Sequence, residues 1–181
     1  MLSRLCRKWM RRFIYGAVAF VGWRLLRYVE FADIDGVAVG VERQITDHSV
    51  RARVGAALSL IKSVDPRRYR RLVHDVGRIA VVSGRLQGYS EPLGVCWLSE
   101  RVMRRWSDAI TAAIMVHVAT QARIASAGVS AWGRAAARVR ACGIRDQVAF
   151  LQGLPAGWYP DRWAYIDWLK SIANSADLSA A

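Results

Sequence analysis

Side chains that could do acid–base or metal chemistry are few in this chain and lie far apart in the sequence. The histidines are His48, His74 and His117, and the cysteines are Cys6, Cys96 and Cys142. This spacing provides neither a paired-cysteine zinc motif nor a disulfide framework. The chain also lacks a phosphate-binding glycine loop, a dinucleotide-binding glycine pattern and a nucleophile elbow, which excludes the commonest nucleotide-binding and serine-hydrolase motifs.

One segment places a histidine on a predicted helix. His117 and Gln121 stand four residues apart in a stretch whose apolar side chains recur at helical spacing. Residues at this separation share one face of a helix. It is the spacing at which two histidines of a zincin helix hold zinc, with a general-base glutamate directly after the first. Here Val118 follows the histidine, and Gln121 stands where the second histidine would be.

The surrounding residues resemble the motif of bacterial zincin-like metallopeptidases, which reads Val-His-Glu-Ala-Thr-His-Ala-Arg. Three dipeptides match it: Val116-His117, Ala119-Thr120 and Ala122-Arg123. Segments 65–69, 76–81 and 94–98 are similar to the stretches that precede the family's active helix, and 137–155 is similar to the helix that carries its third, acidic ligand. The resemblance covers residues 50–155 and implies a zincin-like fold, with Val139 at the position of the acidic ligand.

The departures from this motif remove the family's chemistry. A catalytic zinc site needs three protein ligands and an open position for water. Only His117 remains of the implied set, because Gln121 is a weak neutral ligand and Val139 offers none. Val118 cannot act as a general base. We therefore expect no catalytic residue and no cofactor, with zinc bound only if the remnant position at His117 still takes it.

The leading hypothesis is thus a membrane-associated, catalytically inactive zincin-like protein that acts by binding an unidentified protein or peptide. A peptide could add as a strand along an edge of the predicted hairpin. One alternative is an active zinc-dependent peptidase or other hydrolase with an atypical site, in which His117 works with His48 or His74. Another is that His117 and Gln121 are ordinary half-buried helix residues.

The chain is strongly basic, with 27 Lys and Arg against 14 Asp and Glu and a formal net charge of +13. Such charge can bind the phosphates of nucleic acids or anionic lipid head groups, and it is also typical of a solvated helix face. Because no nucleic-acid-binding motif accompanies it, a nucleic-acid-binding module is the alternative rather than the leading hypothesis. The candidate binding residues form one cluster of Arg67, Arg68, Arg70 and Arg71.

The amino-terminal segment predicts membrane association. Residues 1–28 carry seven basic residues and no acidic one, and 13–23 form an apolar run of 11 residues. A basic stretch before an apolar run is typical of a signal anchor, although roughly 20 residues are needed to span a bilayer as a helix. We expect residues 1–29 to attach the protein to the bacterial inner membrane, on its surface or in the bilayer. The alternatives are a helix packed on an otherwise cytoplasmic protein and a cleaved signal.

The remaining patterns predict a mostly α-helical α+β protein: a zincin-like helical domain with one small β-hairpin, preceded by an N-terminal apolar helix. Helices are expected from Ser49, from Asp65-Pro66, from Ser107 to 126, from about 130 to 151 and after Pro160, the last with Trp163, Ile166, Leu169 and Ile172 on its buried face. Runs 79–83 and 94–98 predict the hairpin. The expected divisions are an anchor at 1–29, an acidic linker at 30–48, the domain at 49–173 and a frayed tail at 174–181.

Overall fold

The protein is an α+β fold in which helices predominate. The structure, a computed structural model, describes residues 16–17, 19–129 and 135–178. Residues 19–26 are helical. The elements that follow are β1 (Val29–Ile34), β2 (Val37–Glu42), α2 (Ser49–Val64), α3 (Pro66–Asp75), β3 (Arg78–Val82), β4 (Gly88–Ser90), the short 3-10 helix η1 (Glu91–Leu93), β5 (Val95–Ser99), α4 (Glu100–Arg105), α5 (Asp108–Ser126), α6 (Ala136–Gln152) and α7 (Asp161–Leu178).

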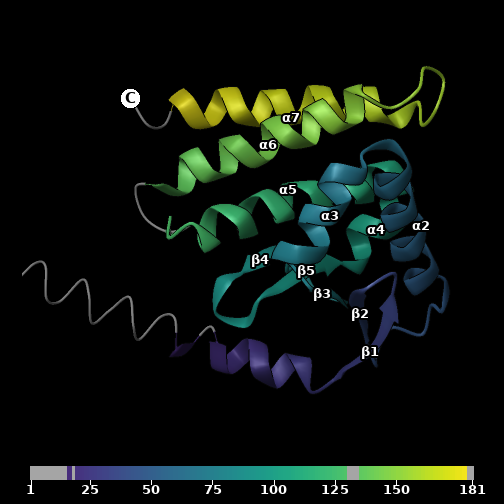
Figure 1. The fold of residues 1–181 in the computed structure, drawn as a ribbon, viewed down its shortest axis with the longest axis vertical. Coiled ribbons are helices and arrows are strands. Elements are labelled where there is room, and N and C mark those ends of the chain that lie inside the picture. The colour runs from purple at the N-terminus through teal and green to yellow at the C-terminus, as the bar shows by residue number, and fades with distance from the viewer. Residues whose placement is uncertain (1–15, 18, 130–134, 179–181) are drawn as a thin grey trace, which may run out of the picture.

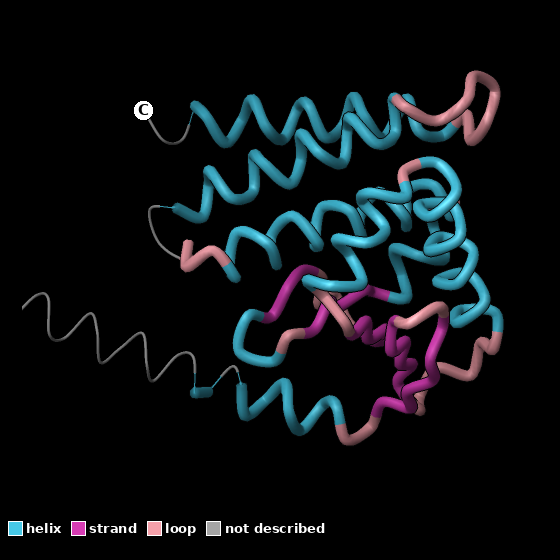
Figure 2. Tube along the Cα trace, in the orientation of Figure 1, coloured by secondary structure: helices cyan, strands magenta, loops and turns pink. Residues whose placement is uncertain are grey.

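The strands form one mixed sheet, not a single small hairpin (Figure 2). Its order is β1-β2-β3-β5-β4, and β3 pairs with β5 in parallel. The prediction that these two apolar runs form a hairpin is therefore wrong. The intervening chain contains β4, which pairs antiparallel with the far side of β5 and takes the edge of the sheet. Because the chain first runs along β4 in the opposite direction to β5, it enters β5 in the same direction as β3, and these two strands pair in parallel.

The segment at 30–48 is not a linker, because most of it forms the antiparallel pair β1 and β2. Asp35 and Gly36 join the two strands with φ angles of 54° and 82°. Positive φ at both central residues is typical of a type I′ turn, for which Asp-Gly is a favoured sequence. The Tyr69 hydroxyl donates to the Asp35 carbonyl at 2.8 Å and ties this hairpin to α3. The folded unit thus begins well before residue 49.

The central strands are buried on both faces. Ile79 and Val81 join the main core under the helices, whereas Ala80 and Val82 join a second apolar cluster on the opposite face. This division follows from the strand geometry, in which successive side chains point to opposite faces. Both faces must therefore be covered, and the continuous apolar runs of β3 and β5 reflect this.

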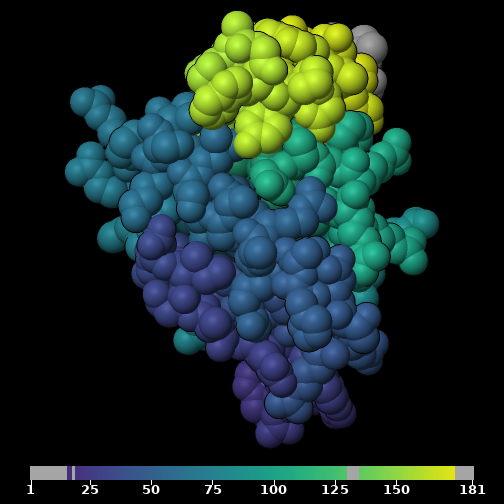
Figure 3. Space-filling view, turned by 90° about the vertical axis from the view of Figure 1, so that its right-hand side faces the viewer, coloured from purple at the N-terminus to yellow at the C-terminus, as the bar shows by residue number. Residues whose placement is uncertain are grey.

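Helices cover one face of the sheet in successive layers (Figure 1). Helices α2 and α5 pack on the sheet and α3 packs against both of them. Helices α6 and α7 lie beyond α5, at the end of the molecule far from the amino-terminal residues (Figures 1 and 3). The helix starts expected at Ser49 and after Asp65 are confirmed. Asp65 caps α3, since its Oδ1 accepts from the Arg68 backbone N–H at 2.9 Å.

The predicted buried face of the last helix is partly wrong. Ile166 and Leu169 are buried, but Trp163 is 51% exposed. Arg162 is buried instead, because its guanidinium donates to the carbonyls of Leu154 and Pro155, both at 2.9 Å. These hydrogen bonds fix the start of α7 with Arg162, and not Trp163, facing the interior of the protein.

The predicted anchor at 1–29 lies largely outside the described residues, as do Cys6 and the part of the tail at 179–181. Across the described part of the chain, no helix is both long and apolar enough to cross a membrane. Helix α7 continues to Leu178, so helical residues extend into the segment for which a frayed tail was predicted from 174.

Candidate functional site

His117 and Gln121 lie side by side on α5, as their spacing predicts. Their side chains are hydrogen-bonded, with 3.0 Å between the Gln121 amide nitrogen Nε2 and the His117 ring nitrogen Nε2. If the amide donates, Nε2 is the unprotonated nitrogen of a neutral ring and Nδ1 carries the proton. Nδ1 is buried and finds no hydrogen-bond partner among the described residues. The histidine is thus held by its neighbour on the same helix.

The other side of the His117 ring packs against α6 at Gly143. A Cβ built on this glycine would lie 2.8 Å from the ring atoms Cε1 and Nδ1, closer than real contacts. Burial lowers the pKa of His117 below its ordinary value, although the neighbouring Gln147 side chain and Gly143 backbone favour the charged ring. The enclosure therefore favours a neutral imidazole.

The other two predicted positions are filled by buried valines. Val118 is 1% exposed and belongs to the main core. Val139 lies on α6 one turn before Gly143, where it is 3% exposed and lines a hollow together with Ile124 of α5. Helix α6 thus brings Val139 to the interface with α5, where it can only pack.

The residues present do not fit a zinc site. Among the residues that the structure describes, no three His, Cys, Asp or Glu side chains are grouped so that they could hold a metal ion. His48 lines a hollow beside β1 and β2, and His74 is exposed on α3, where its Nδ1 lies 2.8 Å from Asp75 Oδ1. His117 instead lies against Gly143 of α6, so the described part of the chain does not bring the predicted histidine pair together.

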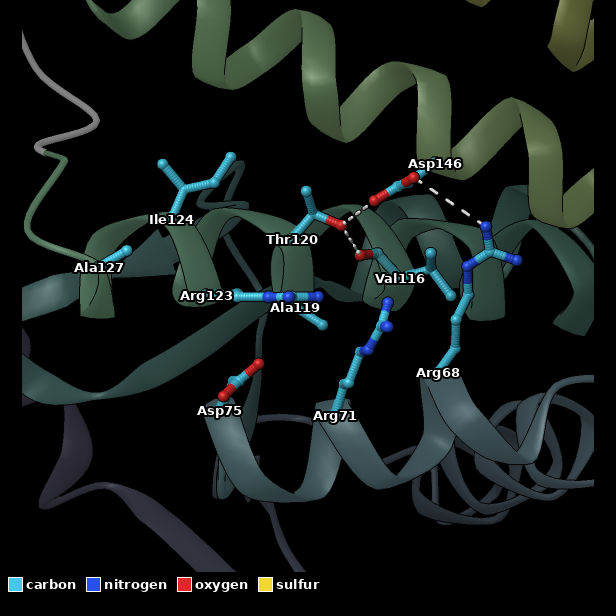
Figure 4. A pocket seen from close by; sticks show the side chains of 10 residues that line it. All are labelled: Arg68, Arg71, Asp75, Val116, Ala119, Thr120, Arg123, Ile124, Ala127 and Asp146. Carbon is cyan, nitrogen blue, oxygen red and sulfur yellow. Dashed lines mark hydrogen bonds and ion pairs between the residues drawn. The ribbon is translucent and has the colours of Figure 1, made fainter.

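The arginine cluster of α3 is divided between two faces of the helix. Arg68 and Arg71 line a cleft of about 280 Å³ between α3, α5 and α6, shown in Figure 4, whereas Arg67 and Arg70 are exposed and do not line it. This division follows from the helical period, because residues three apart share a face and their immediate neighbours do not. The four arginines therefore do not form one surface.

Carboxylates balance the charge of this cleft. Arg68 lies 2.9 Å from an oxygen of Asp65 and 4.0 Å from one of Asp146. The Thr120 hydroxyl also donates to Asp146 at 2.7 Å (Figure 4). Arg71 and Arg123 project into the cleft with Asp75 near them (Figure 4). The cleft is lined by three arginines and by Asp75 and Asp146, and Arg68 is also paired with Asp65 outside the lining, so little excess positive charge is left to attract a polyanion.

An apolar groove, larger than the cleft between α3, α5 and α6, lies beside the edge strand β4. It has a volume of about 550 Å³ and lies between the amino-terminal helical residues and the segment from Leu86 to Leu93. Val21, Leu25, Leu93 and Trp97 contribute much of its apolar wall. Strand β4 also approaches α5, since a Cβ built on Gly88 would lie 3.9 Å from Gln121 Oε1. No local sequence pattern indicates this groove, because its walls come together only through the sheet.

In comparisons with known proteins, the chain matches no family model, no curated protein and no solved structure.

Proposed function

We propose that this protein is a catalytically inactive, zincin-like binding protein that takes an extended peptide beside β4. The observation that carries the proposal is the apolar groove of about 550 Å³ that adjoins the edge strand of the sheet. An edge strand presents backbone N–H and C=O groups to which another chain can add as a strand. The groove would take alternate apolar side chains of that peptide.

The strand and the groove have complementary roles in this proposal. Strand β4 has three residues, so backbone pairing alone would bind a peptide weakly. Val21 and Leu86 in the groove wall, 58% and 44% exposed, offer apolar surface, and burial of such surface stabilises a complex by roughly 25 cal/mol per Å² before the entropic cost of association. We therefore expect a preference for peptides with apolar residues at alternate positions.

The state of the histidine supports binding rather than hydrolysis. His117 Nε2 is engaged by Gln121, and Val118 and Val139 supply neither a general base nor a ligand. In this proposal the zincin-like motif has lost the side chains for zinc chemistry, and the fold is retained for peptide binding. The atypical hydrolase and the nucleic-acid-binding module gain no comparable support from the site.

The binding test uses fluorescein-labelled decapeptide pools with leucine at alternate positions, measured by fluorescence anisotropy against the full chain. Leu86 lines the groove and is 44% exposed, so Leu86→Glu should leave the fold intact. We expect it to weaken binding about tenfold or more. Val129→Glu is the matched control, because Val129 is also 44% exposed and lies outside this groove. Absence of binding by every pool, or equal loss in both variants, would refute the proposed groove.

The inactive, zincin-like part is tested separately by zinc content after exposure to zinc and desalting. We expect the parent chain to retain no stoichiometric zinc. Gln121→His combined with Val139→Glu restores the ligand types that the family resemblance implies, and this variant should retain about one zinc per chain. Zinc retained by the parent and lost in His117→Ala would contradict inactivity. A folded double variant without zinc, checked by circular dichroism, would contradict the zincin-like placement of Val139.

A further inference from the structure

The amino-terminal helical residues are firmly packed on the sheet by one face. Gly22 lies so close to η1 and β5 that a Cβ built on it would be 2.2 Å from Leu93 Cδ1 and 3.6 Å from Trp97 Cζ2. Leu25 and Leu26 pack against the second apolar cluster, which contains Trp97. If this segment left the sheet, that cluster would lose its cover and expose apolar surface to water.

The opposite face of the same segment combines aromatic and basic side chains. Phe20 is 58% exposed and Trp23 is 50% exposed, and Arg24 and Arg27 are also exposed. Positions 20, 23, 24 and 27 follow the three- and four-residue spacing that keeps side chains on one face of a helix. The Arg27 guanidinium carbon lies 4.3 Å from the Trp23 ring centroid, so the two types of side chain form one surface.

We propose that this face, formed by Phe20, Trp23, Arg24 and Arg27, lies in the plane of an anionic lipid surface while the helical segment stays packed on the sheet. The aromatic side chains would enter the boundary between head groups and acyl chains, where Trp is favoured. The arginines would contact lipid phosphates, each contributing about 1 kcal/mol near an anionic surface.

Charge identifies lipid as the partner. Residues 1–28 contain seven basic residues and no acidic one, and the first carboxylate, Glu30, is engaged by Arg43 at 3.1 Å. Two copies of such a face would repel each other, whereas a bilayer with anionic head groups supplies both the charge and the apolar layer that this surface needs.

The packing also sets the orientation of the domain. Because Gly22, Leu25 and Leu26 are committed to the sheet, this segment would lie along the membrane rather than cross it. Helices α6 and α7 lie at the other end of the molecule and would be farthest from the lipid (Figures 1 and 3). Val21 lines the groove beside β4, which would therefore open next to the membrane surface.

Vesicle flotation of the full chain tests this proposal independently of peptide binding. With about 30% phosphatidylglycerol in phosphatidylcholine at about 0.15 M NaCl, we expect binding at least about tenfold tighter than to pure phosphatidylcholine. Trp23→Ser should weaken it about fivefold or more. Trp163→Ser is the matched control, because Trp163 is similarly exposed and lies 4.8 Å from the Arg162 guanidinium. Arg24→Glu with Arg27→Glu should weaken binding to anionic vesicles only.

Three outcomes would overturn the proposal. The first is equal binding to anionic and neutral vesicles, or binding to neither. The second is a loss in Trp163→Ser as large as that in Trp23→Ser, which would place the lipid at α7. The third is resistance of the bound protein to extraction by alkaline carbonate, which would indicate a helix that has left the sheet and entered the bilayer.

Discussion

The imidazole of His117 packs directly against the backbone of Gly143, where α5 meets α6. Glycine inside a helix costs about 1 kcal/mol relative to alanine, yet α6 runs without interruption from Ala136 to Gln152. The contact explains the glycine, because a Cβ at this position would overlap the ring. The ring of His117 and the missing side chain of Gly143 therefore depend on each other.

Gly143→Ala should destabilise the protein. Helix propensity favours alanine by about 1 kcal/mol, but overlap with an enclosed ring costs about 1–3 kcal/mol. We expect a net decrease of about 1 kcal/mol in the free energy of unfolding, measured by urea denaturation. Adding His117→Ala should remove the overlap, so the effects of the two substitutions should be non-additive.

Gly55→Ala is the control for this substitution. Gly55 lies inside α2, and a Cβ there meets its nearest atom, Ile34 Cγ2, at an ordinary 3.8 Å. Only the propensity effect applies, so we expect stabilisation of about 0.5–1 kcal/mol. If both alanine variants were stabilised, the contact between His117 and Gly143 would not constrain the fold.

Stability should decrease as the solution becomes acidic through the pKa of His117. Burial lowers the pKa of the folded state below the ordinary 6.5. Well above pH 6.5 the His117 imidazole is neutral in both the folded and the unfolded state, so it does not change the free energy of unfolding. As the pH falls below this value, the unfolded state takes up the proton first, and the free energy of unfolding decreases until the folded-state pKa is reached.

Urea midpoints between about pH 7.5 and pH 5 measure this decrease. His117→Gln should flatten the profile, whatever its effect at neutral pH. His48→Gln is the control substitution, at an exposed histidine that stands at the start of α2. An unchanged slope in His117→Gln would show that other groups cause the acid sensitivity.

Arg162→Ala should be among the more destabilising substitutions at α7. The buried guanidinium donates to two carbonyls that follow α6, at Leu154 and Pro155. Hydrogen bonds that involve a charged group contribute about 1.5–3 kcal/mol, so we expect a loss of about 3 kcal/mol. Lys170→Ala, at an exposed position on the same helix, should change stability by less than about 0.5 kcal/mol. Similar effects of the two substitutions on thermal unfolding would argue against a structural role for Arg162.

The two cysteines in the described part of the chain should differ in reactivity. Cys96 is buried in β5, and burial raises the pKa of its thiol, whereas Cys142 is half-buried on α6. Because the thiolate is the reactive form, a Cys6→Ser variant treated with Ellman's reagent should react at Cys142 first. Cys96 should react only after addition of guanidinium chloride. Rapid reaction of both thiols without denaturant would contradict the packing of β5.

Elements set by nearby residues could be predicted from the sequence. The start of α3 follows from Asp65 and Pro66, whose capping and φ effects act within one helical turn. The common face of His117 and Gln121 follows from helical spacing in the same way, and the hydrogen bond between them is local to α5.

The tertiary structure decided which of these pieces meet. The sequence by itself determined that 79–83 and 94–98 are extended, but their parallel pairing depends on β4 taking the far side of β5. The sequence also determined that His117 lies on a helix, whereas the enclosure of the His117 ring depends on Gly143 of α6. Capping and periodicity act within about four residues, but strand order and helix contacts depend on how distant apolar surfaces are buried together, and no local pattern encodes that choice.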